Sequence, residues 1–381
     1  MRIALLSTYF ENIGDDLIRS GILEVVNSTF PNAEIIHLSK SNRFSLVADF
    51  GTLTHFPRWQ MSGSEKLWHD RLLRYFPKGI FQKRFNDRVL GSDVLLIAGT
   101  PLFYFTRKKF TFLKQGFWAK EIIQEYMKTG KPIIVAGAGV IFDRSVEDTV
   151  NECQDEMEFL SNLARYSEYF GIRDSVSFQL FEELELTKQV ELTHCPSLWN
   201  TGPKVQREKD LVYISLSVES ASIDEFPERA REKRLQVFTE LVQDLQKKGK
   251  RIKLTAHNNV DHETQKVWAS KLSLEAPILV KSKEMLETFG KPEFLISWRV
   301  HGAMAARLMG TPVLLFKTDN RYKMAEEVGA VIRDDREFEV EDTPDVLRRF
   351  LENPESGQLP ADEIENEKRR LSTILKSIPN G

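Results

Sequence analysis

Short apolar runs alternate with longer amphipathic segments along most of the chain. The runs have the length of strands, and unbroken apolar character is typical of strands that are buried on both faces of a sheet. In the first half we expect strands at 2–7, 93–98, 132–136 and 168–172, with helices at 15–30, 117–128 and 147–166. Parallel strands covered by helices on both faces, the doubly wound α/β class, follow from this alternation.

A polar segment with a Gly-Pro turn signal, 201–210, is the best candidate for a linker. After it we expect strands at 211–217, 251–256, 277–281, 294–298 and 313–316, and helices at 227–248, 261–272, 302–308 and 321–328. A further helix starts with Thr343 as its N-cap and Pro344 at its first position, and a last one covers 359–378. The predicted architecture is two Rossmann-like doubly wound domains facing a cleft, 1–205 and 206–335, followed by a helical tail, 336–381.

The composition excludes several classes of protein. The 53 Lys and Arg residues are balanced by 56 Asp and Glu residues, which gives no support for nucleic-acid binding. Two cysteines are too few for a disulfide scaffold. No stretch reaches the roughly 18 apolar residues that a membrane span needs. We therefore expect a cytoplasmic protein whose attraction for anions comes from a local patch.

Ligands of open α/β sheets bind beyond the carboxyl ends of the strands, so the residues that follow each expected strand are candidates for a site. Asn12, Gly14 and Asp15 follow the first strand, where the glycine allows a tight turn and the aspartate can cap the next helix. Gly137 and Gly139 follow the third strand, where small residues would let backbone N–H groups approach an anion. Taken alone, the first group is better explained as a plain connection between strand and helix, and a tight turn explains the second group equally well.

Cations also follow several of the expected strands. Arg173, beside Asp174, either offers its donor fork to a carboxylate or phosphate or forms a capping pair. Arg299 and His301 are two residues apart, so in extended backbone they project to the same side. Gly302 lets the positive end of the next helix approach an anion, and a histidine there can deliver a proton near neutral pH. Three more cations follow the next strand: Lys317, Arg321 and Lys323.

His257 follows the strand at 251–256 and is a candidate cleft residue. A metal site formed by His257, Asp261 and His262 is conceivable. The spacing is not distinctive, however, and Asn259 or Asp261 is better explained as the cap of the next helix. We therefore expect no metal.

Two stretches, 71–85 and 105–118, combine aromatic residues with basic residues. Aromatic rings could stack on a sugar polymer, and the cations could rest on anionic lipid headgroups at the inner face of a membrane. A helix with a packed apolar face and a solvated cationic face explains the same pattern. A peripheral membrane contact is therefore left open.

Several of these segments resemble the polysaccharide pyruvyl transferase family. The most specific is the block S-W-R-V-H-G at 297–302, which continues to G-T-P at 310–312. Further matching segments lie at 12–15, 137–139, 171–177 and 195–197. The sequence departs from the family where it has Gly99-Thr100-Pro101 in place of a frequent triple glycine, and Cys195 in place of a frequent aspartate.

The resemblance implies a fold similar to the GT-B glycosyltransferases, with phosphoenolpyruvate as donor, a sugar diol as acceptor and a cyclic pyruvate ketal as product. It requires no cofactor. The carboxylate and phosphate of such a donor call for cations, which Arg299, Arg173, Arg321 and one lysine would supply. Adding a hydroxyl to the enol-ether carbon requires protonation of the methylene carbon, for which His301 is the candidate general acid.

Under this reading Arg299 and His301 are catalytic, and the donor is also bound by Gly302 and by either Lys317 or Lys323. The residues assigned to the acceptor side or the cleft are Asn12, Gly14, Asp15, Gly137, Gly139 and His257. The acceptor is a carbohydrate, free or lipid-linked, and the oligomeric state is open. Two alternatives remain: a GT-B glycosyltransferase that uses a nucleotide sugar, with Glu326 or Glu327 on the ribose, and a non-catalytic glycan-binding relative.

Overall fold

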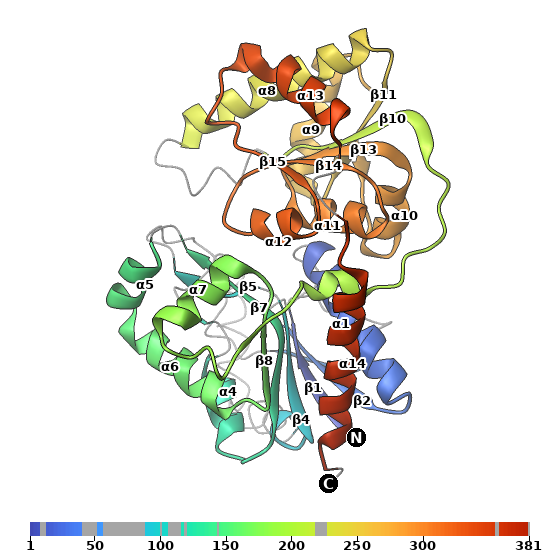
Figure 1. The fold of residues 1–381 in the computed structure, drawn as a ribbon. Coiled ribbons are helices and arrows are strands. Elements are labelled where there is room, and N and C mark those ends of the chain that lie inside the picture. The colour runs from blue at the N-terminus through green and yellow to red at the C-terminus, as the bar shows by residue number, and fades with distance from the viewer. Residues whose placement is uncertain are drawn as a thin grey trace, which may run out of the picture. The chain divides into compact units, whose positions relative to one another are not determined.

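The chain folds as two units. The computed structural model describes residues 1–7, 13–39, 52–55, 88–99, 101–105, 116–117, 120–142, 145–217, 227–354 and 358–379. The first unit comprises 1–11, 18–199 and 365–381, and the second comprises 12–17 and 200–364 (Figure 1). The C-terminal segment expected at 336–381 is therefore divided between the two units.

The first unit is built on a largely parallel sheet (Figure 1). Its strand order is β3-β2-β1-β4-β7-β5-β6, with β8 and β9 continuing from β7, and only β5 and β6 pair antiparallel among the described strands. The strands are β1 (Arg2–Leu6), β2 (Glu34–Ser39), β3 (Thr52–His55), β4 (Val94–Ala98), β5 (Pro101–Phe105), β6 (Gly116–Phe117), β7 (Ile133–Phe142), β8 (Tyr169–Ile172) and β9 (Glu191–Leu192). Every residue of β4 and β8 is buried, as their unbroken apolar runs predict.

The helices of the first unit include most of α1 and of α14, whose first residues belong to the second unit. These helices are α1 (Ile13–Thr29), α4 (Lys120–Met127), α5 (Val146–Glu152), α6 (Gln154–Tyr166), α7 (Ser175–Glu183) and α14 (Ala361–Ser377). In α4, for example, Ile122, Ile123 and Tyr126 recur at helical spacing and are buried in the core. The single helix expected at 147–166 is wrong, because Cys153 leaves helical backbone at φ −122° and ψ 44° and separates α5 from α6.

The turn expected at Gly137–Gly139 is also wrong, since both glycines lie inside β7. Gly137 has a φ of +67°, and the pairing of β7 with β8 shifts register between Val135 and Ala138. The positive φ lets the strand absorb a kink and continue instead of ending. Its second half then pairs with β5, where Gly139 lies opposite Pro101.

The second unit has a six-stranded sheet among the described residues, parallel throughout, in the order β12-β11-β10-β13-β14-β15. The strands are β10 (Glu208–Ser215), β11 (Arg251–Ala256), β12 (Ile278–Leu279), β13 (Pro292–Ser297), β14 (Val313–Phe316) and β15 (Val331–Arg333). From β10 the chain runs outward through β11 to β12 and then returns to β13 on the other side. Such a reversal is the point at which doubly wound sheets bind ligands.

The helices of this unit are α8 (Pro227–Lys247), α9 (Asn259–Lys271), α10 (Met285–Gly290), α11 (Val300–Leu308), α12 (Tyr322–Glu327) and α13 (Thr343–Glu352). Figure 1 shows α8 and α13 on one face of the sheet and α11 and α12 on the other. Two expected caps are displaced by one residue. Asn258, not Asn259 or Asp261, caps α9, and Asp342 precedes α13, which makes Thr343 its first residue. No helix in the described part of the chain is both long and apolar enough to cross a bilayer.

The last helix, α14, is fixed to the first unit by a polar anchor. Glu367 accepts hydrogen bonds from the backbone N–H of His194 at 2.9 Å and from the indole of Trp199 at 3.3 Å. Its Oε1 also lies 2.9 Å from Nδ1 of the His194 ring. Leu371 and Leu375 of the same helix are fully buried. From Glu365 onward, α14 is thus an integral part of the first unit.

Candidate active site

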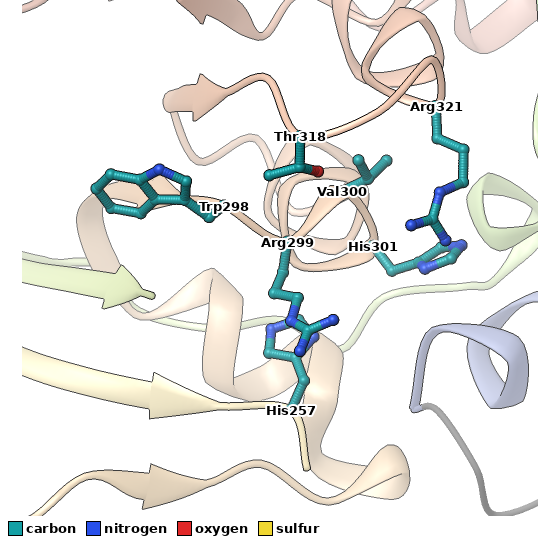
Figure 2. Close-up of a pocket in the computed structure, with 7 residues that line it drawn as sticks. All are labelled: His257, Trp298, Arg299, Val300, His301, Thr318 and Arg321. Carbon is teal, nitrogen blue, oxygen red and sulfur yellow. The ribbon is translucent and has the colours of Figure 1, made fainter. Parts of the chain in front are cut away.

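A pocket lies in the second unit at the carboxyl ends of the strands β11, β13 and β14 (Figure 2). His257 follows β11, the segment 298–301 follows β13, and Thr318 and Arg321 follow β14. Its lining residues are His257, Trp298, Arg299, Val300, His301, Thr318 and Arg321. The pocket therefore brings together four residues that the sequence singled out, His257, Arg299, His301 and Arg321.

Arg299 stands at the junction between β13 and α11. It has extended backbone and occupies the N-cap position, so His301 already belongs to the first turn of the helix. The expectation that both residues project from one extended segment is therefore wrong. The hydroxyl of Ser297 accepts from the N–H of Arg299 and lies 2.9 Å from its carbonyl oxygen, which holds the turn tightly.

Trp298, the residue before Arg299, holds this junction in place through buried contacts of its indole. In Figure 2 its side chain points away from the other pocket residues, and its exposure is 1%. The indole stacks on Phe316 with ring centroids 4.4 Å apart. Its N–H donates to Asp335 at 2.8 Å, and Arg234 donates to the same buried carboxylate at 3.1 Å. A buried tryptophan whose N–H has a partner fixes the backbone that carries Arg299.

Arg299 is oriented by a carboxylate from α9. Its Nε donates to one oxygen of Asp261 at 2.9 Å, and its Nη2 donates to the other at 2.6 Å. Asp261 is buried, whereas the Arg299 side chain keeps 23% of its surface exposed. This fork-to-fork pair fixes the guanidinium plane and leaves Nη1 without a described protein partner. From the sequence, Asp261 was predicted only as a helix cap or a metal ligand, and its contact with Arg299 was not foreseen.

Two glycines make room for the two histidines of the pocket. A Cβ at Gly14, which belongs to the second unit, would overlap the ring of His301. A Cβ at Gly302 would lie 2.8 Å from Cε1 and 2.9 Å from Nε2 of His257. An alanine at Gly14 or at Gly302 would therefore fit only if the neighbouring histidine moved. The N-I-G-D segment and the R-V-H-G block, almost 300 residues apart in the sequence, thus meet at His301.

His257 is uncharged at neutral pH. Burial, aided by the positive charge of Arg299, lowers its pKa from 6.5 to about 3. The ring packs against Phe289 with centroids 5.6 Å apart. Its Nε2 is buried and has no hydrogen-bond partner among the described residues. Figure 2 shows the Arg299 side chain running toward this ring, and Arg321 reaching toward His301.

The remaining predicted cations are paired with carboxylates rather than gathered into a positive patch. Arg321 forms a two-pronged pair with Asp319, at 2.8 Å through Nε. Lys317 lies 3.6 Å from Asp334, and Lys323 lies 2.5 Å from Glu326. Neither lysine lines the pocket. Each of these three cations therefore has a carboxylate partner among the described residues.

Arg173 forms a separate buried feature in the first unit. Its Nη1 donates to the carbonyl of Gly99 at 2.7 Å, while Nε and Nη2 are buried without a hydrogen-bond partner among the described residues. A Cβ at Gly139 would overlap the guanidinium, so this glycine makes room for the arginine. Asp174 caps α7 by accepting from the N–H of Ser177 at 2.7 Å. Nε also lies 4.0 Å from Oδ2 of Asp174, an ion pair that is too long for a hydrogen bond.

Some predicted residues do not line the pocket or lie outside the described part of the chain. Asn12, the stretch 71–85 and most of the stretch 105–118 fall outside the described residues. Asp15 lies in the first turn of α1 and is buried.

No group of three His, Cys, Asp or Glu side chains in the described ranges could hold a metal ion. Of the conceivable metal ligands, Asp261 binds Arg299 and His262 contacts the carbonyl of Pro277 at 3.2 Å.

The sequence model of polysaccharide pyruvyl transferases matches residues 12–320. The chain belongs to this family. The matched range contains all the lining residues of the pocket but Arg321, which follows its last residue directly. It also contains Gly14, which lies against His301. A search among curated proteins gives no match for this pyruvyl transferase family member.

Solved structures similar to this family member share its fold. The UDP-GlcNAc 2-epimerase of Methanocaldococcus jannaschii has a TM-score of 0.56 at 10% identity, covering 99% of this chain and 100% of the epimerase. The enzyme of Neisseria meningitidis bound to UDP-GlcNAc has a TM-score of 0.54 at 11% identity, covering 99% and 100%. Os79 from O. sativa has a TM-score of 0.54 at 10% identity, covering 97% and 94%. The predicted class, two doubly wound α/β domains of the GT-B type with a helical C-terminal tail, is confirmed.

Proposed function

We propose that the protein transfers a pyruvyl group from phosphoenolpyruvate to a sugar diol of a polysaccharide or its precursor, with a pyruvate ketal as product. The observation that carries this proposal is the pocket that the fixed Arg299 guanidinium shares with His301, in the block that most resembles the family. A pocket lined by an oriented donor fork and a histidine suits a substrate that carries anionic groups and must gain a proton.

The proposed chemistry is balanced without a cofactor. His301 gives a proton to the methylene carbon of phosphoenolpyruvate, which becomes a methyl group. The first sugar hydroxyl adds to the neighbouring carbon, and the proton that it loses restores His301. The second hydroxyl then displaces the phosphate from the same carbon, and its proton leaves with the inorganic phosphate. Proton transfer by a positioned side chain typically contributes about 10²–10⁴-fold in rate.

The donor's anionic groups are proposed to bind to Arg299, through the Nη1 that Asp261 leaves uncovered, and to Arg321. Arg173, whose Nε and Nη2 have no hydrogen-bond partner among the described residues, is also proposed to take part in donor binding. Gly302 is proposed to let the N-terminus of α11 approach the donor, and the lysine of the donor site, Lys317 or Lys323, stays a prediction. The assignment of Asn12, Gly14, Asp15, Gly137, Gly139 and His257 to the acceptor side or the cleft also stays a prediction.

Release of phosphate from phosphoenolpyruvate in the presence of candidate sugar acceptors tests the proposal directly. His301→Ala should abolish release yet bind phosphoenolpyruvate, whereas Arg299→Ala should lose donor affinity. Arg348→Ala, an exposed arginine of α13 paired with Asp345 and Glu352, is the matched control and should behave as wild type. Near-normal turnover by His301→Ala would refute its role.

A nucleotide-sugar transferase is the second candidate, because the Neisseria meningitidis epimerase of the same fold is bound to UDP-GlcNAc. Thermal-shift titrations with phosphoenolpyruvate and with UDP- and GDP-sugars separate the two candidates. Stabilisation by phosphoenolpyruvate alone supports the pyruvyl transfer. We propose a cytoplasmic location, with a carbohydrate acceptor that is free or lipid-linked.

A further inference from the structure

His257 is a titratable residue of the pocket to which the proposed chemistry gives no step. We propose that it binds the anionic donor as an uncharged hydrogen-bond donor, offering its Nδ1–H to a carboxylate or phosphate oxygen in the pocket. This inference rests on the proposed function for the identity of the ligand. It adds a residue that selects the ligand through the direction of a hydrogen bond.

The placement of the ring is the first support. His257 lines the pocket at the end of β11, and only 4% of its surface is exposed. Cε1 and Nε2 face the Cα of Gly302, where an added Cβ would lie 2.8 and 2.9 Å away. That edge of the ring is closed by the first turn of α11, which leaves Nδ1 as the nitrogen that can meet a ligand.

The tautomer is the second support. A neutral imidazole carries one proton, and the nitrogen that holds it needs an acceptor. Nε2 is buried without a partner among the described residues, so a proton there would be an unsatisfied buried donor. If Nδ1 instead accepted a hydrogen bond from Arg299, the proton would be forced onto Nε2. The proton therefore belongs on Nδ1.

The charges around the ring explain why an uncharged donor suits this position. Arg299 is balanced by Asp261, and Arg321 by Asp319, so the pocket holds two cations that are already neutralised. A charged imidazole beside Arg299 would be repelled by it, and burial opposes the charge further. With a pKa held near 3, His257 stays neutral over the whole range in which the protein would work.

Two uncharged replacements separate the ring nitrogens. His257→Asn keeps an N–H near the position of Nδ1, whereas His257→Gln places its amide nearer to Nε2. We expect His257→Asn to bind phosphoenolpyruvate within about threefold of wild type, and His257→Gln to bind it roughly tenfold more weakly, because the bond is made to a charged group. The weakening should appear in KM more than in kcat, and should be equal at pH 6 and pH 8.

Binding is measured by calorimetric titration of the full-length protein, with melting temperatures to verify that each variant folds. Equal affinities of the two variants, or a wild-type advantage that disappears above pH 7, overturn the proposal. Inorganic phosphate and pyruvate are titrated in parallel. If wild type binds either of them but not phosphoenolpyruvate, the proposed function fails and the Asn–Gln comparison is decided with that anion. If it binds none of the three, both proposals are refuted.

Discussion

Replacing Gly14 by alanine should inactivate the pocket without changing any charged or titratable group. The added Cβ would overlap the Nδ1 and Cγ atoms of His301 and lie 2.6 Å from its Cβ. The Cβ of His301 is fixed to the backbone of α11, so a simple rotation of the ring cannot relieve the overlap. Either the start of α1 shifts, or the His301 segment does.

The magnitude follows from two opposing effects. In an unhindered helix, Gly→Ala stabilises by up to about 1 kcal/mol, because alanine loses less backbone entropy. Overpacking a filled site costs about 1–3 kcal/mol. We therefore expect Gly14→Ala to lower the free energy of unfolding by about 1–2 kcal/mol. Because His301 is displaced, kcat should fall about 10²-fold or more, the usual contribution of a positioned acid.

Phosphate release at saturating phosphoenolpyruvate and acceptor measures the loss of kcat, and urea denaturation measures the loss of stability. Ser20→Ala is the matched control, since Ser20 is an exposed position of the same helix and should tolerate alanine. A Gly14→Ala variant with wild-type kcat and equal or raised stability would refute the steric coupling between the two segments.

Three further predictions concern charge and protonation. Asp261→Asn should weaken phosphoenolpyruvate binding roughly tenfold in titrations, although it adds net positive charge, because Arg299 loses its orientation; tighter binding would contradict this. The free energy of unfolding should fall as the pH drops below 6.5. In the folded protein the pKa values of His257 and His37 are about 3 and 4, so these histidines take up protons only on unfolding. Urea denaturation at pH 5 should show a loss of about 2 kcal/mol per histidine. Glu367→Gln should destabilise the first unit by about 1–2 kcal/mol in thermal melts, and an unchanged midpoint would contradict the anchoring of α14.

The strands were the part of the fold that the sequence predicted best. The runs at 251–256 and 313–316 coincide with β11 and β14 residue for residue. Such runs are readable because a strand buried on both faces has no polar positions. The short helices α7 and α10 were missed, since six to nine residues that start beside charged side chains carry little periodicity. The kink at Gly137 was predicted as a turn because glycine is typical of both, and the sequence does not show that the strand continues.

The site could be predicted as a set of residues but not as a set of contacts. Arg299, His301, Arg321 and His257 were identified because they follow strands, and the carboxyl ends of neighbouring parallel strands share one edge of the sheet. Their partners come from elsewhere in the chain. Asp261 lies 38 residues before Arg299, and no local rule connects the two. The neutrality of His257 likewise depends on burial that only the folded unit creates.

The pairing of Arg299 with Asp261 and of Arg321 with Asp319 changes how the pocket would recognise an anion. A half-buried guanidinium without a counter-charge would pay a large desolvation cost in the empty protein, and a carboxylate at 2.6 Å removes most of it. An arriving anion then meets a site with little net charge, so long-range attraction contributes little to affinity. Affinity for the anion then comes mainly from the N–H groups, whose direction the carboxylates fix. Because such short, half-buried contacts are only weakly screened by salt, donor affinity should depend on the geometry of Arg299 and His257 far more than on ionic strength.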